Sequence, residues 1–219
     1  YLIEQCHANV EEKDNNGSTP LHIASENGQI EVVKYLIEQC HANVEAKNSK
    51  GNTPLQIASE KGKIEVVKYL YEQYHANVES KDDNGWTPLH YASRDGKIEF
   101  VKYLIEQRRA NVKAKAENGW TPLHFALHYG HIEIVKYLIE QRHVNIESID
   151  EIEIYNVLTG GQIDVVKYLL EQCHANVESK NISGWTPLHL ASVSGKIEFV
   201  KYLIEQCHAN VVAKAENGR

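Results

Sequence analysis

The residues best suited to chemistry in this sequence are four cysteines, each followed directly by a histidine. The pairs are Cys6-His7, Cys40-His41, Cys173-His174 and Cys207-His208. Cys6 and Cys40 are 34 residues apart, as are Cys173 and Cys207, which indicates sequence repetition. Equivalent residues of successive helical repeats stand about 10 Å apart. Zinc needs its ligands within about 2.3 Å of one ion, and a disulfide needs Cα atoms about 4.4–6.8 Å apart. We therefore expect neither a metal site nor a disulfide framework.

The motifs of common catalytic and cofactor sites are absent. The sequence has no G-x-x-x-x-G-K-[ST], G-x-G-x-x-G, H-E-x-x-H, C-x-x-C or G-x-S-x-G. Most glutamates recur at fixed positions that are typical of a solvated helix face. We therefore expect a protein that is not an enzyme and that binds no cofactor.

Composition and charge exclude further classes of function. Of the 219 residues, 42% are apolar and 24% are charged, which is typical of a folded protein, and the net charge is −7. Lys and Arg are dispersed, so the basic patch of a nucleic-acid-binding protein is not predicted. No apolar run is long enough to span a membrane, and no signal peptide is visible. We expect an intracellular, cytoplasmic protein, although a secreted parent protein is also compatible with the sequence.

An internal repeat determines how the secondary-structure elements are arranged. Copies or near copies of Lys-Tyr-Leu-Ile-Glu-Gln begin at Lys34, Lys68, Lys102, Lys136, Lys167 and Lys201. The steps are 34, 34, 34, 31 and 34 residues. A second marker, Gly-x-Thr-Pro-Leu, begins at Gly17, Gly51, Gly85, Gly119 and Gly184. Such self-similarity predicts a solenoid whose units bury their apolar faces against their neighbours.

The third unit illustrates the expected fold of each repeat. A turn is predicted at 82–85, where Gly85 can take a positive φ. Thr87 and Pro88 are typical of a helix N-cap and first helical position, and Gly96 is expected to end that helix. A second helix follows, with an apolar stripe at Ile98, Val101, Leu104 and Ile105.

These units closely resemble ankyrin repeats, in a variant of 34 residues. The family's Thr-Pro-Leu-His motif occurs at Thr19–His22, Thr87–His90, Thr121–His124 and Thr186–His189. The resemblance covers essentially the whole chain and implies an all-α solenoid of stacked helix-turn-helix repeats with short β-hairpin or turn fingers. It also implies that each motif histidine hydrogen-bonds the threonine hydroxyl. The array would comprise a partial repeat 1–12, repeats 13–46, 47–80, 81–114, 115–148, 149–179 and 180–213, and a partial repeat 214–219.

Three departures from the family pattern carry expectations of their own. The extra residue of each repeat lies after the second helix, where the family's helix-ending glycine is missing, so the loop conformation there stays open. Gln56 replaces the motif histidine, which we expect to be tolerated. The fifth repeat, 149–179, is three residues short and lacks the turn and the motif. We expect its helix to start at a capping box, Ser148 to Glu151, with Val157 at the small-residue position and a local shift in helix packing.

The family resemblance implies that partner proteins bind in a concave groove formed by the finger tips and the first helices. The repeats of this chain differ most at the fingers and at the ends of the first helices. We expect a hot region in the third and fourth repeats, because exposed Trp is enriched in binding hot spots. The acidic fingers would suit a partner with some positive charge. The alternative, that each Trp packs on a finger as scaffold, stays open. The candidate partner-binding residues are Trp86, Trp120, Trp185, Arg94, Asp95, His128, Tyr129, Asp83 and Glu117.

The function expected from this resemblance is non-catalytic protein–protein recognition, with an unidentified protein as the partner. One alternative is a structural spacer or elastic array without a specific partner. Another is an accessory region of a larger enzyme, channel or effector. We expect a fragment that is monomeric, with end-to-end contacts possible because neither end carries a polar capping repeat.

Overall fold

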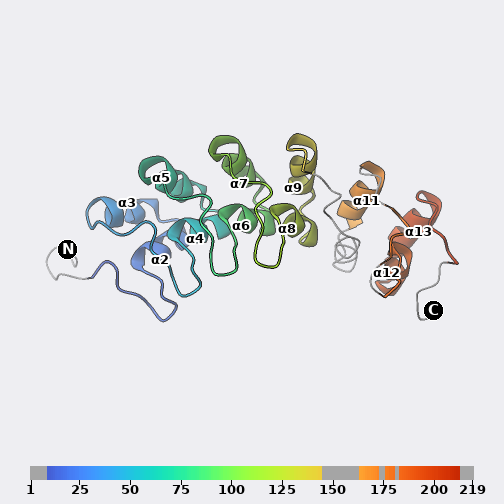
Figure 1. Ribbon diagram of the computed structural model, residues 1–219, viewed down its shortest axis with the longest axis horizontal. Coiled ribbons are helices and arrows are strands. Elements are labelled where there is room, and N and C mark those ends of the chain that lie inside the picture. The colour runs from blue at the N-terminus through green and yellow to red at the C-terminus, as the bar shows by residue number, and fades with distance from the viewer. Residues whose placement is uncertain (1–8, 145–162, 173–175, 181–182, 213–219) are drawn as a thin grey trace. The chain divides into compact units, whose positions relative to one another are not determined.

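The computed structural model describes residues 9–144, 163–172, 176–180 and 183–212 (Figure 1). Within these ranges the chain forms eleven α-helices and two π-helical segments, and no β-strand occurs. The expected all-α architecture is confirmed, and the described fingers are turns. The chain divides into two compact units, Tyr1–Pro122 and Leu123–Arg219. In the part that the structure describes, no helix is both long and apolar enough to cross a lipid bilayer.

In the five repeats that carry the Thr-Pro-Leu marker, the first helix begins at the proline of that marker. These helices are α2 (Pro20–Asn27), α4 (Pro54–Glu60), α6 (Pro88–Arg94), α8 (Pro122–His128) and α12 (Pro187–Val193). Pro is suited to the first helical position because its missing N–H would have no helical partner there. A glycine in the left-handed region follows each helix, with φ between 66° and 76° at Gly28, Gly62, Gly96, Gly130 and Gly195. Those glycines keep the first helices short.

The second helix of each repeat begins two residues after that glycine. These helices are α3 (Ile30–Glu38), α5 (Ile64–Tyr74), α7 (Ile98–Lys102) continuing as η1 (Tyr103–Gln107), α9 (Ile132–Lys136) continuing as η2 (Tyr137–Gln141), α11 (Ile163–Gln172) and α13 (Ile197–Glu205). The predicted stripe in the third repeat is buried at Val101, Leu104 and Ile105, but Ile98 is only half-buried. Phe100, which the stripe did not include, is 1% exposed.

The structure shows the conformation of the loop after the second helix, which the sequence left open. A residue other than glycine takes the left-handed conformation in every described copy, with φ between 49° and 55° at His41, His75, Arg109, His143 and His208. The next N–H reaches back six residues, as from Ala76 to the carbonyl of Leu70 at 3.2 Å. A widened last turn of the second helix accommodates the extra residue of the 34-residue repeat. In η1 and η2 this turn is a π-helix.

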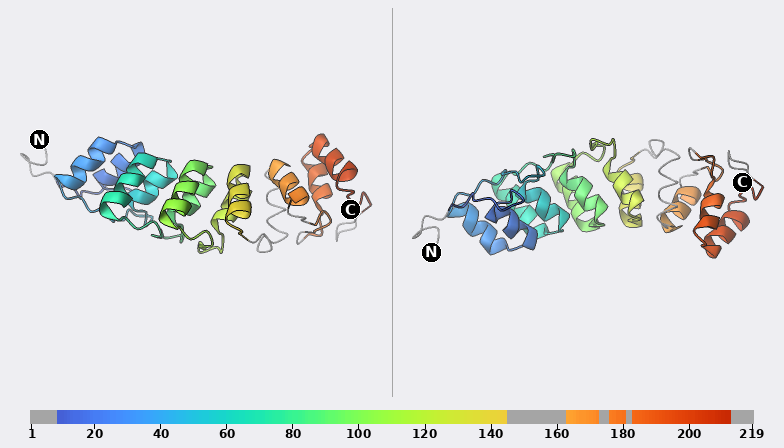
Figure 2. Two further views of the ribbon diagram at one scale, coloured as in Figure 1. Left: turned by 90° about the horizontal axis from the view of Figure 1, so that it is seen from above. Right: turned by 90° about the horizontal axis from the view of Figure 1, so that it is seen from below.

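The first unit consists of two rows of helices with the fingers projecting to one side. Helices α2, α4 and α6 form one row, and α3, α5 and α7 form the other (Figures 1 and 2). Leucines of the first row and valines of the second fill the space between them and are at most 1% exposed: Leu21, Leu55, Leu89, Val33, Val67 and Val101. Neither row could bury this surface alone, so each repeat depends on its neighbours.

Hydrogen bonds recur between successive repeats of the first unit at both the fingers and the second helices. At the fingers, the N–H of Asp83 donates to the carbonyl of Lys50 at 3.1 Å. At the second helices, the Tyr69 hydroxyl donates to Glu38 at 2.6 Å, and the Tyr103 hydroxyl donates to Glu72 at 3.3 Å. The two partners of each Tyr–Glu pair are 31 residues apart in the sequence.

The second unit preserves this pairing on both sides of the fifth repeat. The Tyr202 hydroxyl donates to Glu171, again 31 residues away, but Tyr168 and Glu140 are only 28 residues apart and still lie 2.8 Å from each other. The three missing residues therefore do not prevent the pairing between these second helices. The expected capping box at Ser148 to Glu151 and the position of Val157 lie outside the described residues.

Candidate protein-binding surface

The motif histidines His22 and His90 join their first helices to the finger of the next repeat. In the first repeat, Nδ1 of His22 accepts from the Thr19 N–H at 3.2 Å and lies 2.9 Å from its hydroxyl. Nε2 of His22 lies 2.9 Å from the Asn52 carbonyl and therefore carries the proton. The hydrogen bond to threonine that the resemblance implied is confirmed, and the contact with the next repeat adds to it.

Burial keeps the imidazoles of His22 and His90 neutral. Loss of hydration lowers the pKa of His22 below its usual value and lowers the pKa of His90 to about 4. Gln56 reproduces the arrangement without an ionisable group, because its Oε1 accepts from the Thr53 N–H at 2.9 Å and its Nε2 donates to the Trp86 carbonyl at 2.9 Å. Gln56 thus has both the acceptor and the donor contacts on which the expectation of tolerance was based.

The third finger is held by the carboxylate of Asp82. Its Oδ1 accepts from the N–H groups of Asn84 and Trp86 at 3.0 and 2.7 Å. The Gly85 N–H donates to the Asp82 carbonyl at 3.0 Å, and φ of Gly85 is 75°, as the turn prediction required. This arrangement fixes where the finger presents the indole of Trp86.

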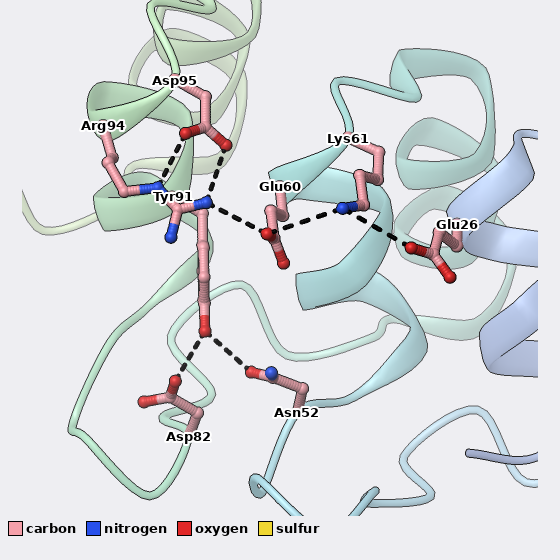
Figure 3. Close-up of polar contacts among 8 residues, drawn as sticks. All are labelled: Glu26, Asn52, Glu60, Lys61, Asp82, Tyr91, Arg94 and Asp95. Carbon is pink, nitrogen blue, oxygen red and sulfur yellow. Dashed lines mark hydrogen bonds and ion pairs between the residues drawn. The ribbon is translucent and has the colours of Figure 1, made fainter. Parts of the chain in front are cut away.

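Tyr91, in α6, connects this finger to the preceding one. Its hydroxyl donates to Oδ2 of Asp82 at 2.6 Å and lies 3.0 Å from Oδ1 of Asn52 (Figure 3). Burial raises the pKa of Tyr91, and the neighbouring Asp82 carboxylate adds to the effect. The ring of Tyr91 lies 5.1 Å from that of Trp86. One buried side chain therefore positions two fingers and an indole.

A row of alternating charges crosses the ends of the three first helices (Figure 3). Nε of Arg94 donates to Asp95 at 2.7 Å, and Nη2 donates to Glu60 of the preceding repeat at 3.1 Å. Nζ of Lys61 lies 3.5 Å from Glu26 and 3.7 Å from Glu60. The hydrogen bond to Asp95 raises the pKa of Arg94 above its usual value.

The structure brings three of the predicted site residues together. Cζ of Arg94 lies 5.3 Å from the ring centroid of Trp86 while its guanidinium binds Asp95. Trp86 is half-buried, so it packs on its own first helix and also presents part of its ring to solvent. This geometry is compatible with both interpretations of Trp86, as a contact residue for a partner and as a scaffold residue of the finger.

The other predicted residues lie elsewhere. In the first unit, Asp83 and Glu117 lie at separate finger tips, where their N–H groups donate to the preceding finger, and Trp120 is half-buried on the fourth finger. The rest belong to the second unit. The ring centroids of His128 and Tyr129 are 4.9 Å apart, and those of Trp185 and His189 are 6.4 Å apart.

The described side chains offer no metal centre. No three His, Cys, Asp or Glu residues among them gather closely enough to hold an ion. Cys40 and Cys207 are free thiols, whereas Cys6 and Cys173 lie outside the described residues.

Sequence reasoning did not identify the residues that hold this surface in place. Tyr91 is the clearest case, because the corresponding residues of the other repeats that carry the Thr-Pro-Leu marker are Ile23, Ile57, Phe125 and Leu190. A hydroxyl that occurs at only one of five equivalent apolar positions was the available signal. Glu26, Glu60 and Lys61 lie at the ends of first helices, where the repeats differ most, but the row that they form with Arg94 was not predicted.

Comparison with known proteins identifies the family. A family model described as ankyrin repeats in three copies matches residues 1–82, 73–150 and 154–215. A search of curated proteins found no match to the chain. Proteins built from ankyrin repeats generally bind other proteins and are typically non-catalytic. Matches over most of its length, together with the stacked helix pairs, show that this chain belongs to the ankyrin-repeat family.

Proposed function

We propose that the chain is a single ankyrin array, 1–219, that binds a partner protein through one surface of its first three repeats and the fourth finger. We call this the finger surface and define it by the finger turns 14–18, 48–52, 82–86 and 116–120 and the helix ends 26–27, 60–61 and 94–95. Trp86, Arg94 and Asp95 form its centre. Asp83, Glu117 and Trp120 extend it. His128, Tyr129 and Trp185 are proposed separately as partner-binding residues of the second unit.

The observation that carries this proposal is the fixed geometry of a half-exposed indole. The ring of Trp86 packs against that of Tyr91, with the centroids 5.1 Å apart, and the backbone N–H of Trp86 donates to Asp82. A rigid aromatic group loses little conformational freedom on binding, which favours affinity. Arg94, another residue type that is common in binding hot spots, lies beside it and is fixed by two carboxylates.

The test is capture of a partner from a lysate of the source organism, with the whole chain as bait. The double variant Trp86→Ala/Trp120→Ala is expected to lose the captured protein while its helical circular dichroism is kept. A matched control is Tyr35→Ala, which removes an exposed aromatic side chain from the second-helix row and should capture normally. Equal capture by the double variant would refute the proposed surface.

A structural spacer is the second candidate, and the recurring contacts between repeats favour it. Equivalent Tyr–Glu pairs join successive second helices in both units, so added repeats could extend the array without altering any binding surface. A spacer should return no saturable partner in the same capture experiment. A protein retained only by the wild-type chain would reject this candidate.

A further inference from the structure

Lys61 occupies an unusual place on the finger surface. It is the residue that follows α4, and its ammonium group lies between the carboxylates of Glu26 and Glu60, which hold equivalent positions in adjacent repeats. The equivalents of Lys61 in the other repeats that carry the Thr-Pro-Leu marker are Asn27, Asp95, Tyr129 and Ser194. The second repeat is thus the only one of these five with a cation at this position.

The contacts of Lys61 are weak. Its distances of 3.5 and 3.7 Å exceed the length of about 2.7–2.9 Å that is typical of a charged hydrogen bond. The side chains of Lys61 and Glu26 are 42% and 43% exposed. Ion pairs of this kind contribute little to stability, so the cation can leave the two carboxylates at small cost.

Arg94, the neighbouring cation, is held quite differently. Its guanidinium makes hydrogen bonds of 2.7 and 3.0 Å with Asp95 and one of 3.1 Å with Glu60. It also lies over the rings of Trp86 and Tyr91. Arg94 is therefore a fixed part of the surface, whereas Lys61 is weakly held between two carboxylates.

The charge of the whole finger surface points in the same direction. Its defined positions carry seven carboxylates, at Asp14, Glu26, Glu60, Asp82, Asp83, Asp95 and Glu117, and three cations, at Lys50, Lys61 and Arg94. A surface with this excess attracts a partner of opposite charge and disfavours acidic partners.

We propose that the partner presents a lysine or arginine side chain, which takes the place of Lys61 between Glu26 and Glu60. Lys61 is then an internal stand-in for the partner's cation and lowers the affinity of the free chain for basic segments. This inference rests on the proposed function, because it names the chemistry of the partner at that same surface.

The experiment uses the whole chain and a short oligolysine peptide, with binding measured by calorimetry at low ionic strength. Lys61→Gln removes the competing cation and is expected to tighten binding about twofold to fivefold, the range that one exposed ion pair supplies. Glu26→Gln is expected to weaken binding by a similar factor and leaves the Arg94–Glu60 pair intact.

Matched controls come from α3, on the opposite row of helices. Lys34 and Glu31 form an exposed pair at 2.8 Å, so Lys34→Gln and Glu31→Gln change the net charge equally without touching the finger surface. Both should have smaller effects than their counterparts. Equal effects of Lys61→Gln and Lys34→Gln would overturn the inference, as would unchanged binding by Glu26→Gln.

The proposed function is tested separately, by the capture experiment with the Trp86→Ala/Trp120→Ala variant. Lys61→Gln and Glu26→Gln could bind oligolysine no differently from Lys34→Gln and Glu31→Gln, while partner capture still depends on Trp86 and Trp120. In that case the inference about Lys61 is wrong and the proposed finger surface is retained. If capture does not depend on those two residues, the finger surface itself is refuted.

Discussion

At the scale of single residues, the buried histidines couple stability to pH. His90 binds Thr87 through Nδ1 and the carbonyls of Ala114 and Trp120 through Nε2. Only the neutral imidazole can make this set of bonds, because Nδ1 must accept. Its pKa is about 4 in the folded chain and 6.5 in the reference state.

The pH dependence predicted for His90 therefore has a definite sign. As the pH falls from 6.5 towards 4, the unfolded chain takes up a proton and the folded chain does not, so the free energy of unfolding falls. His90→Gln, which copies the arrangement of Gln56, should reduce this loss while the hydrogen bonds are kept. Urea unfolding of both proteins at about pH 7.5 and about pH 5 measures the difference. An identical pH dependence in the variant would contradict the assignment.

Tyr91 carries the second prediction at this scale. Tyr91→Phe leaves Oδ2 of Asp82, a 7% exposed residue, without its hydroxyl donor, and should lower the free energy of unfolding by about 1–3 kcal/mol. Tyr129→Phe is the control, because Tyr129 is 47% exposed and should change stability little. A Tyr91→Phe chain as stable as the control variant would show that the hydroxyl bridge is not needed.

The residue scale also shows what sequence reasoning could and could not reach. The role of Gln56 was predictable, because a glutamine offers an acceptor and a donor as the imidazole does. The bridge from Tyr91 to Asp82 and Asn52 was not predictable, because it depends on the rotamers of side chains from two repeats. Tyr91 and Asn52 are 39 residues apart in the sequence. The pairing of Lys61 with Glu26 across repeats was hidden for the same reason.

At the scale of elements, the first helix of the third repeat begins at Pro88 and ends before Gly96, as the sequence predicted. The ends of the second helices were not predicted. The missing glycine left the loop open at the sequence level. The structure fills the left-handed position with histidine or arginine in each described copy. The left-handed conformation costs a non-glycine residue about 1–2 kcal/mol of steric strain, which glycine avoids.

His75→Gly is therefore expected to raise the free energy of unfolding by about 1 kcal/mol, since relief of this strain exceeds the added flexibility of the unfolded chain. The converse variant is Gly195→Ala. An added Cβ at Gly195 meets no atom within 4 Å, but φ is +67°, so only backbone strain should destabilise it. Chemical denaturation measures both variants. Destabilisation by His75→Gly would show that the imidazole makes contacts worth more than the strain.

At the scale of the whole molecule, the 34-residue period predicted the succession of helix pairs, because each repeat has nearly the same sequence. The period did not predict how the fifth repeat accommodates its missing residues. The Tyr168–Glu140 contact depends on where the following helix regains its register, which no local pattern encodes.

A prediction about the fifth repeat follows from its missing finger and motif. Limited proteolysis of the whole chain should cut first between residues 149 and 161 or at the ends. A variant in which Gly-x-Thr-Pro-Leu-His is restored in the fifth repeat should resist cutting there for longer. A first cut within residues 13–114, where the contacts between repeats recur, would contradict this expectation.

The central claim is that partners bind the finger surface. Hydrogen exchange of the whole chain, measured alone and with the protein that it captures, tests this claim most directly. We predict that the bound partner slows exchange at the finger turns around Trp86 and Trp120 and at the helix ends around Lys61 and Arg94. Slowed exchange confined to the second helices α3, α5 and α7, with the fingers unchanged, would contradict the claim.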